Sequence, residues 1–224
     1  TTWNIEYGLT GFNQATGSGI GTVVSGITST TYTLNNLSPN TCYDVYIQSV
    51  CGVGDSSTWF GPLNFCTDCG IFTAPYAETF DGTTWGPTAF VYFDSELDNC
   101  WDATPSTQGA GTVFKWVVDN GTTASFSTGP NGDASSAGTG NYLYAESTYS
   151  TGGIATLYTP VIDFSGLTKP TLSFAYHMYG SSMGDLYVSY FNGTSYDTIH
   201  VITGQQQMSG GAAWRIAYVD LTNY

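Results

Sequence analysis

Residues 37–47 read Leu-Ser-Pro-Asn-Thr-Cys-Tyr-Asp-Val-Tyr-Ile, which is a turn followed directly by an alternating strand. Pro and Asn favour the turn, and apolar side chains at every second position after it are typical of a strand with one buried face. Tyr43 opens this strand two residues after Thr41. That placement predicts a tyrosine corner, in which the hydroxyl of a buried ring bonds back to the preceding loop.

Short alternating runs of the same kind recur along the chain. Helical periodicity is almost absent, because 28 Gly, 8 Pro and many β-branched residues interrupt it. The runs cover residues 3–7, 31–34, 43–47, 112–116, 141–144, 171–176 and 186–190. Strands of this length and spacing predict an all-β fold made of β-sandwich domains.

The composition excludes several classes of function. With 41% hydrophobic and 16% aromatic residues, the chain is too apolar to be a disordered tail. Three basic residues and a formal net charge of -14 leave little to neutralise phosphates or anionic lipid, so we expect no binding to nucleic acid. No apolar run reaches the roughly 18 residues of a membrane span, so we expect no direct membrane insertion.

Five cysteines in a chain rich in Ser and Thr predict an extracellular protein, because disulfides persist outside the cell. A turn centred near residue 54 would place Cys42 opposite Cys66, since antiparallel partners keep a constant index sum. These two are expected to form a disulfide. In the alternative, Cys51 pairs with Cys66 or Cys69 and another thiol is free.

A change in strand spacing around residues 66–70 predicts a domain boundary at residue 68 or 69. Before it, four segments resemble the second half of a fibronectin type III domain, of a variety common in surface and secreted proteins of gliding Bacteroidota. They are residues 3–8, 32–34, 37–43 and 59–62. The first two strands of that sandwich have no counterpart in residues 1–68. The resemblance therefore implies that other sequence, or another chain, closes the sandwich.

Seven motifs follow one another in residues 69–224: residues 78–81 (Glu-Thr-Phe-Asp), 99–101 (Asn-Cys-Trp), 114–116, 129–133, 140–146, 155–160 and 172–180. With these motifs the segment resembles a MAM domain, a jelly-roll-like β-sandwich. Their order and spacing agree over about 150 residues. The family has further closing strands, so both domains are expected to be truncated. The resemblance also implies a disulfide between Cys69 and Cys100, with the partner of Cys51 in the missing start of the type III domain.

The MAM resemblance implies a cation site as well. In that family the acid after the opening Phe and the acid of the Gly-Pro loop meet at a cation, and this sequence has Asp81 and Asp133 at the two positions. Glu146 is a further candidate ligand. Oxygen ligands from loops suit Ca²⁺, with Na⁺ as the alternative. The expected role of the cation is structural, since it would fix the loops.

Catalytic motifs are absent from the sequence. The only histidines, His177 and His200, are expected to pack structurally, and no pattern of a nucleophile elbow, a zinc protease or a P-loop occurs. Residues 66–69 match C-x-x-C, but they join two β domains and not a strand to a helix. The acidic run 94–102 is interpreted as a solvated loop, with a divalent cation site as the alternative. We therefore expect no enzyme activity.

Aromatic residues offer the remaining candidate site, because exposed rings are platforms on which sugar faces stack. Trp59, Trp85 and Tyr149 are the three expected at the surface, with packing under loops or against neighbouring domains as the alternative. Three Asn-x-Ser/Thr sequons, at Asn36, Asn120 and Asn192, are interpreted as turns.

These features predict a non-catalytic adhesion or binding module of a large exported multidomain surface protein. In the Bacteroidota that the resemblance indicates, such arrays belong to adhesins exported by the type IX secretion system. Expected partners are neighbouring domains of the same polypeptide, glycans and other surface proteins. Two alternatives stay open: an accessory region of a secreted protease or glycoside hydrolase, and a structural subunit of a surface filament.

Overall fold

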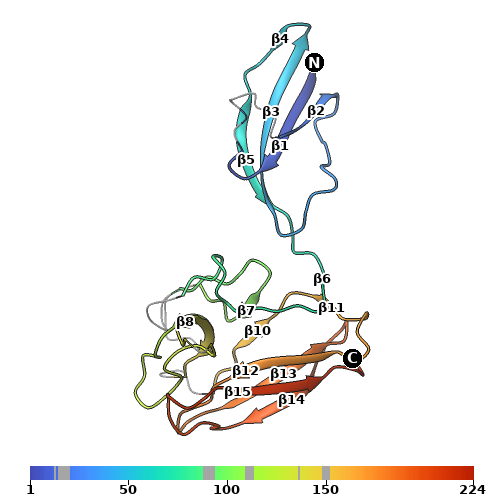
Figure 1. The fold of residues 1–224 in the computed structure, drawn as a ribbon. Helices are drawn as coiled ribbons and strands as arrows, with labels where there is room; N and C mark the ends of the chain where they lie inside the picture. The colour runs from blue at the N-terminus through green and yellow to red at the C-terminus, as the bar shows by residue number, and fades with distance from the viewer. Residues whose placement is uncertain (13, 15–20, 88–93, 109–113, 136, 148–151) are drawn as a thin grey trace. The chain divides into compact units, whose positions relative to one another are not determined.

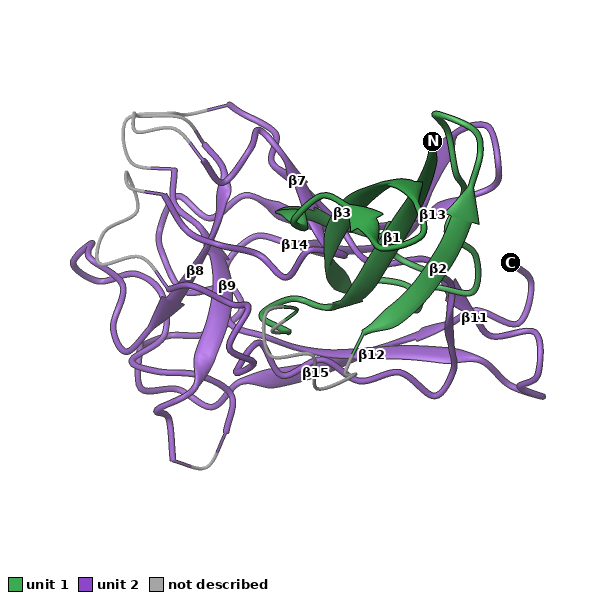
Figure 2. Cartoon of the chain, turned by 90° about the horizontal axis from the view of Figure 1, so that it is seen from above, with its two compact units in different colours: residues 1–70 green, residues 71–224 purple. Residues whose placement is uncertain are grey.

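The computed structural model of the chain describes residues 1–12, 14, 21–87, 94–108, 114–135, 137–147 and 152–224. These residues form fifteen strands and no α-helix, so the all-β prediction is confirmed. Within this part of the chain no helix is long and apolar enough to cross a membrane. The chain divides into two compact units, Thr1–Gly70 and Ile71–Tyr224 (Figure 2).

Unit 1 is one antiparallel sheet in which the strands lie side by side in the order β2-β1-β3-β4, with β5 also paired to β3 (Figure 1). Its strands are β1 (Thr2–Leu9), β2 (Thr22–Ile27), β3 (Cys42–Gly52), β4 (Asp55–Ser56) and β5 (Phe60–Cys66). The prediction of a strand at residues 31–34 is wrong. This segment lies outside the sheet and pairs with no strand in the described residues of unit 1.

The two faces of the unit 1 sheet differ in polarity. Residues that face one another across β1, β3 and β5 form an apolar face: Trp3, Ile5, Tyr7, Leu9, Tyr43, Val45, Ile47, Phe60, Leu63 and Phe65. The side chains on this face differ in solvent exposure. Tyr43 and Val45 are each only 8% exposed, whereas Leu9 is 63%, Leu63 65% and Phe60 83% exposed. The exposed residues lie on β1 and β5, on either side of β3, so the apolar face is only partly covered.

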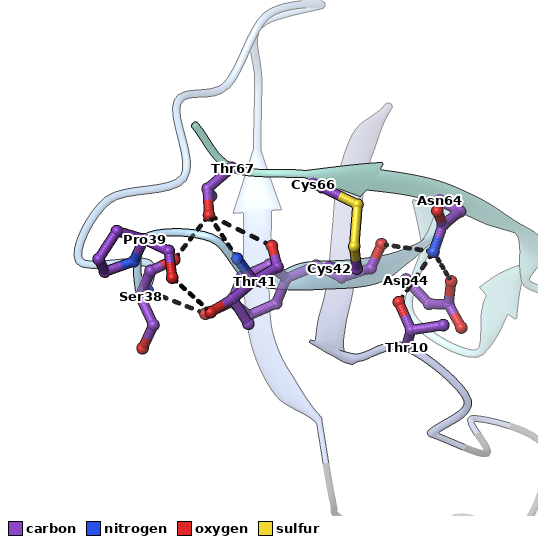
Figure 3. Close-up of a disulfide and its surroundings, with 10 residues drawn as sticks. Thr10, Ser38, Pro39, Thr41, Cys42, Asp44, Asn64, Cys66 and Thr67 are labelled. Atoms are coloured by element: carbon purple, nitrogen blue, oxygen red, sulfur yellow. Dashed lines mark hydrogen bonds between the residues drawn. A yellow bond between two sulfur atoms is a disulfide. The ribbon is translucent and has the colours of Figure 1, made fainter. Parts of the chain in front are cut away.

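The turn-and-strand segment that begins at residue 37 folds as a tyrosine corner. The Tyr43 ring is buried, and its hydroxyl accepts a hydrogen bond of 2.9 Å from the Ser38 backbone amide. On the opposite face of β3, Cys42 pairs with Cys66 of β5 and forms a disulfide with it (Figure 3). The hydroxyl of Thr67 donates to the Ser38 carbonyl at 2.7 Å, which ties the end of β5 to the same loop.

Unit 2 consists of ten shorter strands in two-stranded sheets (Figure 1). They are β6 (Phe72–Thr73), β7 (Asp102–Thr104), β8 (Trp116–Asn120), β9 (Asn141–Ala145), β10 (Thr156–Tyr158), β11 (Ile162–Asp163), β12 (Thr171–Tyr176), β13 (Asp185–Phe191), β14 (Tyr196–Thr203) and β15 (Arg215–Asp220). The pairs are β6 with β11, β7 with β10, β8 with β9, β12 with β15 and β13 with β14, and only the first is parallel.

Two apolar clusters hold unit 2 together. The first joins Val117 of β8 to Tyr142 and Tyr144 of β9, with Trp214 packed against them. The second joins Met178, Ile202 and Ala217, with four partly buried neighbours: Phe174, Tyr176, Met183 and Leu186. Because Trp214 comes directly before β15, it brings the start of that strand to the β8–β9 pair.

Candidate functional site

Asp81 and Asp133, although 52 positions apart in the sequence, converge on the backbone just before β9. A Cβ atom on Gly140 would lie 2.7 Å from Oδ1 of Asp81 and 2.8 Å from Oδ2 of Asp133. Any side chain at this position would collide with both carboxylates. The next amide, that of Asn141, donates to Oδ1 of Asp81 at 2.8 Å. Glycine at position 140 thus lets both carboxylates lie against the backbone without being displaced.

Local hydrogen bonds keep Asp133 ionised and oriented. Its Oδ2 accepts the Ser135 amide at 3.0 Å, and its Oδ1 accepts the Ser135 hydroxyl at 2.9 Å. Burial acts to raise the pKa of Asp133, but these bonds together with one from the Gly140 amide outweigh it and lower the pKa. Asp133 is therefore a preformed carboxylate beside Asp81.

Glu146 is the third candidate ligand, and it lies just beyond the end of β9. It follows the far end of β9, five residues after Asn141, and at about 3.3 Å per residue the strand carries it roughly 17 Å away. In the described ranges no three His, Cys, Asp or Glu side chains gather in a way that could hold a metal ion. Glu146 as a third ligand of the Asp81–Asp133 site therefore stays a prediction.

The Asp81–Asp133 pair supplies the kind of oxygen donors that a hard cation accepts. Two carboxylates, held close by a residue without a side chain, offer up to four oxygens, and Ca²⁺ accepts six to eight ligands in irregular geometry. Backbone carbonyls and water would have to supply the rest. Such a cation would cancel the repulsion of the two acids and cross-link the segment before β7 to the loop before β9.

The three aromatic candidates have different outcomes. Trp85 is only 4% exposed and packs edge-on against Phe80 and Trp101, with ring centroids 5.0 Å and 5.5 Å away, so its expected surface role is wrong. Trp59 lies between β4 and β5 and is half-buried. Tyr149 lies outside the described residues.

The acidic run lines an open hollow of about 470 Å³ together with Thr84 and Trp101. Two of its carboxylates, those of Asp98 and Asp102, already have local partners. Asp98 accepts the Thr84 hydroxyl at 2.8 Å and the Cys100 amide at 3.0 Å, and Asp102 accepts the Ala103 amide at 2.8 Å. The loop is therefore held by hydrogen bonds among its own residues.

Lys115 is a buried lysine that the sequence pattern does not predict. It is 1% exposed, and its Nζ donates to the Thr107 carbonyl at 3.0 Å. The motif of residues 114–116 predicts an aromatic strand, yet β8 begins only at Trp116, and nothing in the local pattern indicates a buried lysine.

His177 packs against an aromatic ring. The His177 ring lies 5.7 Å from the Trp214 ring, and burial lowers the pKa of His177 because it disfavours the imidazolium. In the part of the chain that the structure describes, no hydrogen bond joins His177 or His200 to a serine hydroxyl, a cysteine or a carboxylate.

Sequence reasoning missed an exposed apolar patch on the β13–β14 pair. Tyr187 lies opposite Val201, and Phe191 opposite Tyr196, on one face of the two strands. The four side chains, called the hairpin surface below, are 58%, 42%, 49% and 57% exposed, respectively. The Tyr196 ring also lies 4.9 Å from Phe191 and 5.7 Å from Tyr158. Alternation along residues 186–190 was the available signal, since it puts aromatic rings on both faces.

Four of the five cysteines are disulfide-bonded. Besides the Cys42–Cys66 pair, Cys69 and Cys100 are each disulfide-bonded, and Cys51 is free and exposed. The structure thus contains the first pairing that the hairpin arithmetic predicts, and not the alternative in which Cys51 takes Cys66.

The similarity of this chain to known proteins includes a family match that lies within unit 2. Residues 93–224 match the family described as MAM domain, meprin/A5/mu. Neuropilin-1a from Danio rerio is 32% identical over 135 residues, which cover 57% of this chain but only 14% of the relative. No solved structure matches the chain. Asp81 lies before the matched residues and Asp133 within them. Because the match covers more than half of an all-β chain, this chain belongs to the MAM domain family.

Proposed function

We propose that the chain is a non-catalytic adhesion and binding module of a larger extracellular protein. Membership of the MAM family, the similarity to a neuropilin and the disulfide-bonded cysteines support this. The chain spans 14% of the length of that relative.

The hairpin surface is the observation that carries the proposal. Tyr187 and Val201 form one exposed pair and Phe191 and Tyr196 a second on the same face of β13 and β14, with the Ser189 and Thr198 hydroxyls between the two pairs. Aromatic residues are enriched in the cores of protein interfaces and carry most of their binding energy. A flat patch of this kind fits the surface of another protein.

A bead adhesion assay tests this proposal. Beads coated with the 224-residue chain should attach to monolayers of cultured cells, and the double variant Phe191→Ser/Tyr196→Ser should attach several-fold less. The matched control is Tyr218→Ser, because Tyr218 is 71% exposed but lies on β15. Equal attachment of beads that carry wild-type chain and beads that carry the double variant would refute the role of the hairpin surface.

For unit 1 we propose the second half of a fibronectin type III sandwich, from an exported surface protein of the Bacteroidota type. The sheet order, the tyrosine corner and the partly open apolar face support this. Strands from outside residues 1–70 would cover Leu9, Phe60 and Leu63. A hydrophobic dye should bind the 224-residue chain, and Leu63→Ser should weaken that binding. Dye binding that is unchanged by the substitution would argue against an open apolar face.

For Asp81 and Asp133 we propose a structural Ca²⁺ site, with Na⁺ as the alternative occupant. The convergence of both carboxylates on Gly140 supports it. The cation would hold the loops of unit 2 and would take no part in chemistry.

A further inference from the structure

A second hollow, distinct from the hairpin surface, lies beside the loop of residues 121–131, which follows β8. Its volume is about 480 Å³, and its lining comes from this loop together with Tyr179 and Gly210. Volumes of roughly 300–1,000 Å³ are typical of small-molecule sites. The lining residues all belong to the described part of the chain.

The loop beside this hollow is held in one conformation from both ends. At its start the Tyr142 hydroxyl donates to the Gly121 carbonyl at 3.0 Å. At its end the Gly129 amide donates to the Tyr179 carbonyl at 2.9 Å, and the Asn131 amide to the Gly210 carbonyl at 3.0 Å. A site that is ordered before binding loses less entropy when a ligand arrives.

Phe126 stands at this hollow with 99% of its surface exposed. The loop around it is closed on itself, because the Thr123 hydroxyl donates to the Thr128 carbonyl at 3.1 Å and the Thr128 hydroxyl to the Ser125 carbonyl at 3.2 Å. These two bonds fix the backbone on either side of Phe126, and its ring points into solvent. An aromatic face held in water beside a polar hollow is a platform for a ligand with an apolar face.

Polar groups around the ring remain open to a ligand. In the described residues the side chains of Thr122, Ser127, Asn131 and Tyr179 form no hydrogen bond with the protein, although all four line the hollow. Two hydroxyls, one amide and one phenol can both donate and accept. No Lys, Arg, Asp or Glu is among the described lining residues, and the chain carries a net charge of -14. An anionic ligand would thus meet no cation here.

We propose that this hollow binds a neutral carbohydrate. One face of a pyranose ring would stack on Phe126, and its hydroxyls would exchange hydrogen bonds with Asn131, Tyr179 and Ser127 in place of water. Neutral sugars match the lining because they combine an apolar ring face with many uncharged donors and acceptors. Sialylated or sulfated sugars would require cationic side chains that the lining lacks.

An oligosaccharide array tests the proposal with the whole 224-residue chain. The probes are neutral oligosaccharides that end in galactose, glucose, mannose or N-acetylhexosamine, with sialylated and sulfated versions beside them. At least one neutral probe should be retained, and the acidic versions should bind more weakly. Phe126→Ala should reduce the affinity for the retained probe by about tenfold or more, the loss expected for an aromatic anchor. Because Phe126 is exposed, this substitution leaves the fold intact.

Two control variants separate this site from the others. Phe60→Ala removes an exposed Phe, 83% accessible, from unit 1, and Phe191→Ser/Tyr196→Ser removes the hairpin surface. Both should keep the affinity for the retained probe. The proposal is overturned if no neutral probe is retained, if only acidic probes bind, or if Phe126→Ala binds as wild type does. Bead attachment that depends on Phe126 and survives enzymatic removal of cell-surface glycans would assign the ring to a protein partner and would also overturn it.

Discussion

The backbone amide of Ser38 donates a 2.9 Å hydrogen bond to the hydroxyl of Tyr43, five residues further along the chain. The ring that carries this hydroxyl is buried and lies 5.9 Å from the Phe65 ring of β5 and 6.5 Å from the Tyr7 ring of β1. A single side chain thus joins three strands of unit 1 to the loop that precedes β3.

Removing the Tyr43 hydroxyl should therefore destabilise unit 1. Tyr43→Phe leaves the ring packing in place but deprives the Ser38 amide of its acceptor, and the loss of a typical hydrogen bond costs about 0.5–1.5 kcal/mol. Urea unfolding of the 224-residue chain should show the loss as a lower midpoint for unit 1. Tyr46→Phe is the matched control, since the structure gives the Tyr46 hydroxyl no hydrogen-bond partner among the described residues, and its midpoint should stay within error of wild type. Equal effects of the two substitutions would contradict the corner.

The tyrosine corner and the Cys42–Cys66 register could be predicted because both depend on neighbours along the chain. A turn fixes which residues face each other, and the paired register holds despite shifts between Val45 and Ile47 and between Val50 and Gly52. The prediction for Trp85 failed for the opposite reason. Its burial depends on Phe80 and Trp101, and local pattern does not show which rings meet in space.

The candidate site was predictable to a similar degree. Family resemblance placed Asp81 and Asp133 together, and both lie beside Gly140 in the structure, whereas Glu146 as their third partner stays a prediction. Phe126 was missed because a lone Phe in a run of Ser, Thr and Gly has no periodicity from which its exposure could be judged. The strand expected at residues 31–34 failed because strand propensity alone cannot supply a partner.

Peptide mapping of the unreduced protein should find the disulfide pattern. One cross-linked peptide should join Cys42 to Cys66, and a second should join Cys69 to Cys100. Cys51, which is exposed and free, should react with iodoacetamide without prior reduction. Reduction of the Cys42–Cys66 bond should lower the stability of unit 1 by about 2–4 kcal/mol. A peptide that joins Cys51 to Cys66 would contradict the register.

Chelation should lower the melting temperature of unit 2 if a cation lies between Asp81 and Asp133. A ligand that binds only the folded state stabilises it by about 2.7 kcal/mol at 100 times its Kd. Melting in 2 mM CaCl₂ should therefore occur at a higher temperature than melting in EDTA, and replacement of NaCl by choline chloride tests Na⁺ in the same way.

Two substitutions test whether the effect of calcium on the melting temperature comes from the Asp81–Asp133 site. Asp133→Ala should abolish the difference between calcium and EDTA. Asp163→Ala is the control, because Asp163 accepts the Ser165 amide at 2.9 Å much as Asp133 accepts that of Ser135 but has no such acid pair, and the difference should remain. Identical melting of wild type with and without calcium or sodium would remove the cation from the proposal.

Acidification from pH 7 to pH 5 should weaken unit 2 through His177. Burial lowers the pKa of this imidazole in the folded state, whereas in the unfolded chain it is about 6.5. Below pH 6.5 the unfolded state therefore binds more protons, so the stability present above this pH is lost as the pH falls through the folded pKa. His177→Phe, which keeps a ring against Trp214, should flatten the dependence of the unfolding free energy on pH, and His200→Phe should retain it. Asp44, Asp133, Asp163 and Asp220, whose pKa values are lowered, contribute below this window. Parallel slopes for wild type and His177→Phe between pH 5 and pH 7 would exclude the histidine as the cause.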